Sequence, residues 1–181
     1  GQQYDVNFET RSDVTEAEYI EMIRLKTSVL LANALQTGAY IAGANEEQIQ
    51  ALYSFGIHVG LAFQIQDDIL DVYGDAATFG KPIGGDILNN KKTYMLLTAL
   101  EKAQGEDKEE LDYWLRQPNA DPAAKIAAVR DIYTRVGVRS VCEQIMLAHT
   151  KQALALLESL PQNAACEALR QLADKLLNRD K

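Results

Sequence analysis

The sequence predicts an all-α protein, and three observations lead to this prediction. Apolar side chains recur with the helical period over most of the chain, and residues that favour helix starts precede several of these stretches. Short turn-forming segments, such as 104–107 and 117–121, separate them. No stretch alternates apolar and polar residues as a half-buried strand would. We therefore expect helices throughout the chain.

The first expected helix begins at Asp13, because Asp13 and Glu16 have the spacing of a capping box, and it extends to residue 42. The residues before Asp13 are polar and look extended, so no helix is expected there. The remaining helices are expected at 46–73, 91–103, 108–115, 122–136, 139–160 and 164–178, with a Gly- and Pro-bearing loop at 78–85. We assign packing roles, and no chemistry, to the helices beyond residue 124.

Composition bounds the class of protein. The chain has 181 residues, of which 47% are hydrophobic, enough for one globular domain over 1–181. Its 18 basic and 26 acidic residues give a net charge of −8, which disfavours binding to nucleic acid or to an anionic membrane. No stretch approaches the roughly 20 apolar residues of a spanning helix, so we expect no membrane insertion. Cys142 and Cys166 form no metal or redox motif, which suits a cytoplasmic location.

The most informative segment is the acidic face of the second long helix. Asp67, Asp68 and Asp71 lie on one stripe with Gln64, and most of the remaining helix surface is apolar, so we expect a buried helix whose acidic strip faces a cavity. Like charges at this spacing each destabilise a helix by about 0.2–0.5 kcal/mol, and no basic residue lies between 64 and 75. The alternative is a solvated acidic face, which usually interleaves Lys or Arg. Hard oxygen ligands without His or Cys favour Mg²⁺ bridging to a diphosphate.

Basic residues suited to such an anion lie on both sides of this segment. Lys26 interrupts an apolar stripe, although a lysine there can also extend along the surface to solvent. Lys81 lies on the Gly-bearing loop, and Lys91 and Lys92 follow it. The loop matches no Walker A or Rossmann pattern. Together with the acidic strip, the lysines predict a metal-dependent diphosphate site.

Five elements in order carry a resemblance to a known family: Gly1-Gln2 with Asp5, Lys26-Thr27, Phe63-Gln64-x-x-Asp67-Asp68-x-x-Asp71, Gly80-Lys81, and Gly84-x-Asp86-Ile87-x-x-x-Lys91. The sequence resembles the C-terminal half of a trans-isoprenyl diphosphate synthase, of the polyprenyl synthetase family that includes farnesyl and geranylgeranyl diphosphate synthases. The resemblance implies an all-α bundle of the isoprenoid synthase type.

The resemblance also implies a role for each matching residue. Asp67, with Asp71 and Asp68 in support, would bind Mg²⁺. Lys26 and Lys81 would hold the allylic diphosphate, and Lys91 would support that end of the site. Thr27 and Gln64 would stabilise the allylic cation with their oxygens. The implied reaction is ionisation of an allylic diphosphate, attack by isopentenyl diphosphate and loss of a proton, giving a short-chain product such as farnesyl or geranylgeranyl diphosphate.

The sequence also departs from the family pattern. The first aspartate-rich motif, the arginine pair after it and the isopentenyl diphosphate site precede the Gly1-Gln2 element in the family, so we expect a bundle without its N-terminal helices that is inactive alone. The resemblance implies a homodimer for the full-length protein. The alternatives are a non-catalytic helical subunit or scaffold and a terpene cyclase; the Lys26-Thr27 and Gly84-x-Asp86 elements argue against the cyclase.

Overall fold

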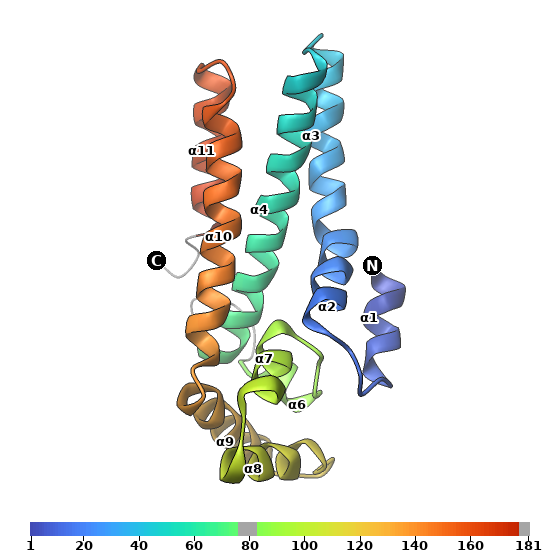
Figure 1. The fold of residues 1–181 in the computed structure, drawn as a ribbon, viewed down its shortest axis with the longest axis vertical. Helices are drawn as coiled ribbons and strands as arrows, with labels where there is room; N and C mark the ends of the chain where they lie inside the picture. The colour runs from blue at the N-terminus through green and yellow to red at the C-terminus, as the bar shows by residue number, and fades with distance from the viewer. Residues whose placement is uncertain (76–82, 178–181) are drawn as a thin grey trace.

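The computed structural model describes residues 1–75 and 83–177. All regular secondary structure in these two ranges is helical, which confirms the predicted all-α class (Figure 1). Within the same ranges, no helix combines the length and the apolar character needed to cross a lipid bilayer.

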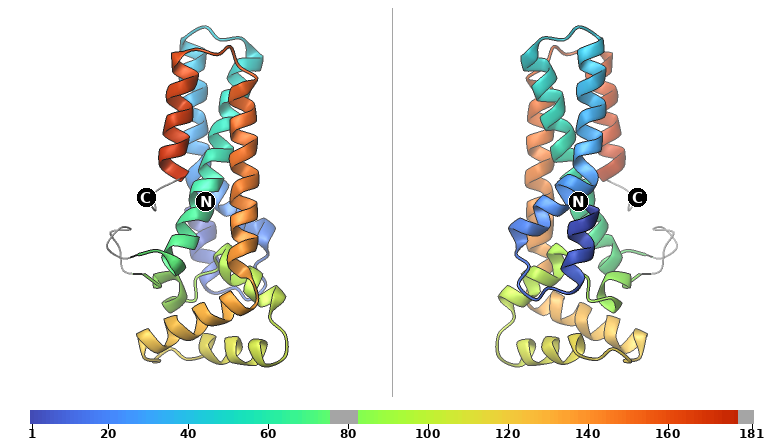
Figure 2. Two further views of the ribbon diagram at one scale, coloured as in Figure 1. Left: turned by 90° about the vertical axis from the view of Figure 1, so that its left-hand side faces the viewer. Right: turned by 90° about the vertical axis from the view of Figure 1, so that its right-hand side faces the viewer.

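Four long helices run side by side along the longest axis of the molecule (Figures 1 and 2). They are α3 (Val29–Ile41), α4 (Glu46–Tyr73), α10 (Val138–Glu158) and α11 (Ala164–Leu177). Helix α4 contacts the other three and is the central element of this bundle. The α3–α4 and α10–α11 connections lie at the same end, drawn uppermost in Figure 2. The acidic segment of α4 therefore lies toward the opposite end.

Shorter helices close that lower end. They are α6 (Gly85–Leu88), α7 (Tyr94–Lys102), α8 (Gly105–Leu115) and α9 (Pro122–Arg135), and α8 and α9 cross beneath the bundle in Figure 2. Their buried apolar side chains join those of α2 (Glu16–Ile23), α4 and α10 in one continuous core. This core fixes the lower part of α4 against the elements that surround its carboxylates.

The N-terminal segment differs from the prediction in two ways. Residues Gln2–Glu9 form a helix, α1, where an extended segment was expected; only Phe8 of this helix is buried, so its apolar pattern is too weak to indicate a helix. The N-cap of α2 is Thr15, whose hydroxyl accepts from the Glu18 amide. The Glu18 carboxylate accepts in return from the Thr15 amide, so the capping box lies two residues after the predicted one.

The predicted helix over 13–42 contains an irregular turn. A π-helical turn, Arg24–Ser28, joins α2 to α3, so that the chain stays helical from α2 through α3. It packs against α4, where Gly60 lies so close that a Cβ at that position would be 2.6 Å from the Ser28 Cα. The missing side chain of Gly60 thus lets the backbones of the π turn and α4 meet.

The other predicted helices are confirmed with small shifts at their ends. Helix α4 has the predicted bounds, because Asn45 caps its first turn and Gly74 follows its last residue. Helix α7 begins three residues later than predicted, since the Thr93 hydroxyl accepts from the Leu96 amide and caps it. Helix α8 begins earlier, at Gly105, and the four-residue α6 was not predicted. Most of the predicted loop 78–85 lies outside the described residues.

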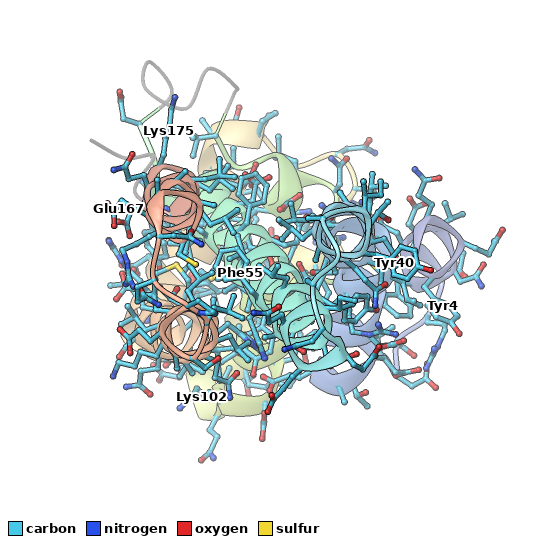
Figure 3. All side chains as sticks on the ribbon, turned by 90° about the horizontal axis from the view of Figure 1, so that it is seen from above. Tyr4, Tyr40, Phe55, Lys102, Glu167 and Lys175 are labelled. Carbon is cyan, nitrogen blue, oxygen red and sulfur yellow. The ribbon has the colours of Figure 1, made fainter. Side chains whose placement is uncertain are left out.

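A second, smaller core occupies the upper bundle. It combines apolar residues of α4, α10 and α11: Phe55, Val59, Ala153, Leu157 and Ala173. Figure 3 views the molecule from above, with Phe55 inside the bundle and Tyr4 and Tyr40 on its outer surface. Tyr40 on α3 is 75% exposed. The α3 side of the bundle therefore presents apolar surface to solvent.

Two histidines meet between α4 and α10 and lead to a prediction about pH. The Nδ1 atoms of His58 and His149 are 3.0 Å apart. Burial lowers the pKa of both, and the charge of His58 lowers the pKa of His149 further. Since the folded-state pKa values lie below the unfolded ones, their contribution to stability is complete above about pH 6.5 and is lost as the pH falls below it.

We therefore expect the free energy of unfolding of wild type, relative to that of the His149→Gln variant, to decrease from pH 7.5 to pH 5.5. Urea unfolding at both pH values measures the difference. An equal pH dependence in the two proteins would contradict this prediction.

Candidate active site

The carboxylates of α4 do not form a uniformly solvated face. Asp67 and Asp71 are partly buried, and Asp68 is only 2% exposed. The Tyr19 hydroxyl of α2 donates to the Asp68 carboxylate at 2.5 Å. Burial raises the pKa of Asp68 to about 7, against the opposing effect of this hydrogen bond. The contact ties α2 to the acidic segment, and the alternative of a solvated strip fails for Asp68.

Removal of the Tyr19 hydroxyl is expected to destabilise the fold. Tyr19→Phe removes the hydroxyl that donates to the buried Asp68 carboxylate, and we expect the free energy of unfolding to fall by about 1–3 kcal/mol. Chemical denaturation at pH 7 measures this change. Tyr113→Phe, on an exposed tyrosine of α8, is the matched control and should change stability little. Equal stability of Tyr19→Phe and wild type would contradict the structural role of the contact.

Asp71 holds the turn that leads into α6. Its backbone carbonyl accepts from the Gly84 amide at 2.6 Å, and its carboxylate accepts from the Asp86 amide at 2.9 Å. Gly84 has φ +86, and a Cβ there would lie 2.6 Å from the Ile126 side chain. Glycine therefore permits both the backbone conformation and the close approach. The result is that Asp86 is held beside Asp71.

Lys91 completes this cluster. Its Nζ lies 3.2 Å from Asp86 Oδ1, and its amide donates to the Asp86 carbonyl at 2.9 Å. Burial acts to lower the pKa of Lys91, but the charges of Asp86 and Asp68 outweigh it and raise the pKa above its usual value. Lys91 and Asp5 both line a cavity of about 330 Å³. The cluster therefore offers an ammonium group beside carboxylates at a solvent-accessible cavity.

The π turn supplies the next pair of predicted residues. Lys26 forms an ion pair with Asp5 of α1 at 2.5 Å. Thr27, the next residue, donates from its hydroxyl to Gln64 Oε1 at 3.1 Å, across 37 residues of sequence. The structure thus brings Thr27 and Gln64 together, and it places Lys26 beside a residue that shares the cavity with Lys91.

One predicted residue cannot be placed. Lys81 lies in 76–82, outside the described residues, and its role stays a prediction. No role was predicted for Tyr19, Asp5 or Asp86. Asp5 and Asp86 belong to the motifs quoted above, and this membership could have indicated that they lie at the site. Tyr19 occupies a core position of an amphipathic helix, and no sequence pattern identifies a partner 49 residues away.

The acidic residues fit a metal that shares its ligands with a substrate. Asp67 and Asp71 are one helical turn apart, on the same side of α4. Among residues 1–75 and 83–177, no group of three or more His, Cys, Asp or Glu side chains is arranged to hold a metal ion by itself. Mg²⁺ is commonly bound by one or two carboxylates together with waters and substrate phosphates. A carboxylate pair of this kind is compatible with such an ion.

A larger cavity of about 680 Å³ lies elsewhere, between the end of α4 and helices α9 and α10. Tyr73, Arg130 and Arg139 are among its lining residues, and none of the predicted site residues that the structure describes lines it. Its position gives no reason to move the candidate site away from the acidic end of α4.

Comparisons with known proteins point to one family. The family model described as polyprenyl synthetase matches residues 1–132. A short chain isoprenyl diphosphate synthase from Methanothermobacter thermautotrophicus is 41% identical over 180 residues, which are 99% of this chain and 54% of that protein. A geranylgeranyl pyrophosphate synthetase from Pyrococcus horikoshii is similar in structure, with a TM-score of 0.88 and 36% identity over 98% of this chain and 53% of the other.

A third similar protein was solved with ligands. It is a geranylgeranyl pyrophosphate synthase from Corynebacterium glutamicum in complex with isoprenyl diphosphate and magnesium, with a TM-score of 0.88 and 31% identity over 98% of this chain and 51% of the other. In each of these comparisons the chain spans about half the length of the relative that it matches.

Proposed function

Because the chain belongs to the polyprenyl synthetase family, we propose that it supplies the allylic-diphosphate side of a prenyltransferase that joins an allylic diphosphate to isopentenyl diphosphate. One observation carries this proposal. The Thr27–Gln64 hydrogen bond, the Lys26–Asp5 ion pair and the Asp71–Asp86–Lys91 contacts gather three distant segments around the acidic end of α4. The names of the relatives support the same chemistry.

The carboxylates of α4 are the proposed metal ligands. Asp67 would hold Mg²⁺ directly, and Asp71 and Asp68 would support it. Bound there, Mg²⁺ would neutralise charge on the diphosphate and favour its departure. The Asp86 amide and the Tyr19 hydroxyl each donate to one of the supporting carboxylates and so fix its orientation.

The lysines are the proposed diphosphate ligands. Lys26, Lys91 and, in the loop, Lys81 would bind the diphosphate oxygens and stabilise the charge that develops as the allylic bond breaks. Lys26 and Lys91 are both held by carboxylates, Asp5 and Asp86, at 2.5 and 3.2 Å. These ion pairs keep the ammonium groups oriented before the anion binds, which lowers the entropy lost on binding.

Thr27 and Gln64 are the proposed stabilisers of the allylic cation. The Thr27 hydroxyl donates a hydrogen bond to Gln64 Oε1, so the lone pairs of the hydroxyl oxygen remain available to positive charge. The π turn presents Thr27 toward α4, and Gly60 allows this approach. The departing diphosphate would accept the proton lost after isopentenyl diphosphate attacks.

The remaining expectations extend the proposal. Residues 1–181 would form the C-terminal part of one synthase domain, and the full-length protein would be a cytoplasmic homodimer. Its product would be of short chain length, as the names of several relatives suggest. The non-catalytic subunit is the second candidate, and the assay below distinguishes it.

Prenyl transfer tests the proposed function. The full reading frame that encodes this chain and the 181-residue chain alone are each incubated with isopentenyl diphosphate, dimethylallyl diphosphate and Mg²⁺, and the products are analysed by mass. We expect a longer prenyl diphosphate from the full reading frame and none from the 181 residues. Absence of product in both arms would favour the non-catalytic subunit, and product from the chain alone would refute the need for further sequence.

A further inference from the structure

Lys125 of α9 is buried in a way that packing alone does not explain. The residue is 4% exposed, and its ammonium donates to two neutral oxygens of the described residues, Asn90 Oδ1 at 2.8 Å and the Leu88 carbonyl at 3.3 Å. None of the ion pairs found among residues 1–75 and 83–177 involves Lys125. Burial lowers its pKa. A buried ammonium without a carboxylate partner destabilises the fold. We therefore ask what the contacts of Lys125 with Asn90 and Leu88 contribute.

The residue that Lys125 holds most closely has an uncommon conformation. Asn90 has φ +48, in the left-handed region that residues other than glycine rarely occupy. Its side chain is held at both ends, because Oδ1 accepts from Lys125 and Nδ2 donates to the Leu115 carbonyl at 2.9 Å. These contacts tie the Asn90 turn to α8 and α9.

The Asn90 turn directly precedes Lys91. The Lys91 amide donates to the Asp86 carbonyl, and its Nζ pairs with the Asp86 carboxylate. The Asp86 amide in turn donates to Asp71 on α4. A continuous set of contacts therefore leads from Lys125, through Asn90, to the lysine and the aspartate of the candidate site.

We propose that Lys125 is a positioning residue, which fixes the Asn90 turn and thereby aims Lys91 at the cavity that Lys91 shares with Asp5. Its effect on diphosphate binding rests on the function proposed above; its effect on the Asn90 turn does not. A purely structural lysine would act differently, since its replacement by an apolar side chain of similar length would change stability and leave Lys91 in place.

Amide hydrogen exchange tests the structural step without any ligand. In Lys125→Met, we expect the Lys91 amide to exchange about tenfold faster than in wild type. The Ile49 amide, hydrogen-bonded to the Asn45 carbonyl at the far end of the bundle, is the internal control and should not change. Lys151→Met, on the exposed surface of α10, is the matched variant and should leave both amides unchanged. An unchanged Lys91 amide in Lys125→Met would overturn the proposal.

Calorimetric titration with inorganic diphosphate in the presence of Mg²⁺ tests the functional step. We expect Lys125→Met to bind about tenfold more weakly than wild type, and Lys91→Met to bind more weakly as well. The double variant should bind no more weakly than Lys91→Met, because Lys125 acts through Lys91. If the losses of affinity add in the double variant, Lys125 does not act through Lys91 and the proposal is overturned. If wild type does not bind diphosphate, the proposed function fails. The hydrogen-exchange experiment, which uses no ligand, still tests whether Lys125 positions the Asn90 turn.

A second variant, Asn90→Gly, tests the same proposal if Lys125→Met does not fold. Asn90→Gly tolerates the left-handed conformation while removing the oxygen that Lys125 contacts. We expect it to show the same faster exchange at Lys91 and the same weaker binding. Wild-type exchange and affinity in a folded Asn90→Gly protein would overturn the proposal.

Discussion

Gly60→Ala is expected to lower the free energy of unfolding by about 2–3 kcal/mol. A Cβ at this position of α4 would lie 2.6 Å from both the Cα and the Oγ of Ser28, in the π turn. Ser28 is fully buried, and the first of these contacts is to backbone, so rotation of a side chain does not relieve it. The two helices must separate. Because Thr27 belongs to the same turn, we also expect weaker binding of Mg²⁺-diphosphate.

The matched control is Gly38→Ala in α3, for which no atom lies within 4 Å of the added Cβ. There the substitution only improves helix propensity, and we expect a gain of up to about 1 kcal/mol. Urea denaturation of the three proteins, with slopes compared to check the two-state model, measures both changes. Stability changes of the same sign and size in the two variants would contradict the close approach of the π turn to α4.

Asp67→Ala is expected to weaken binding of inorganic diphosphate in Mg²⁺ by about 100-fold, and Asp68→Asn and Asp71→Asn by less. The smaller losses of affinity at Asp68 and Asp71 follow from their contacts. The Asp68 carboxylate accepts from the Tyr19 hydroxyl, and the Asp71 carboxylate accepts from the Asp86 amide. An asparagine in either place keeps an acceptor oxygen for that donor. Calorimetry with the same protein preparations measures all three affinities.

The control for a simple change of charge is Asp131→Ala, on the exposed surface of α9. It removes a carboxylate that is not one of the predicted ligands, and we expect the affinity of this variant to stay within about twofold of wild type. Wild-type affinity in Asp67→Ala, or an equal loss in Asp131→Ala, would show that Asp67 is no metal ligand and would favour the helical scaffold.

Local signals were sufficient to predict most of the fold. Helix α4 was predicted with its observed bounds, because a Gly- and Pro-bearing segment follows it in the sequence, and in the structure Asn45 and Gly74 cap its two ends. Helix α1 was missed, since its single buried residue, Phe8, produces no helical pattern. The π turn was missed because its five residues keep the helical period of their neighbours. The turn packs closely against Gly60 of α4, a tertiary contact that no local pattern indicates.

The sequence indicated most of the residues of the candidate site, but only part of how they lie relative to one another. The acidic stripe follows from helix geometry, so Asp67 and Asp71 could be grouped from the sequence. The Tyr19–Asp68 contact joins residues 49 positions apart, and nothing local indicates it. Lys125 was overlooked for the same reason. It lies on a helix with an ordinary core pattern, and its significance comes from burial next to Asn90.

In the proposed function, the carboxylates of α4 and the neighbouring lysines together bind a diphosphate through a divalent cation. Titration of the wild-type chain with inorganic diphosphate, with Mg²⁺ and then with the metal removed by chelator, tests this binding. We predict saturable binding with Mg²⁺ and at least about tenfold weaker binding without it. Equal affinity in the two conditions, or no binding in either, would contradict the claim.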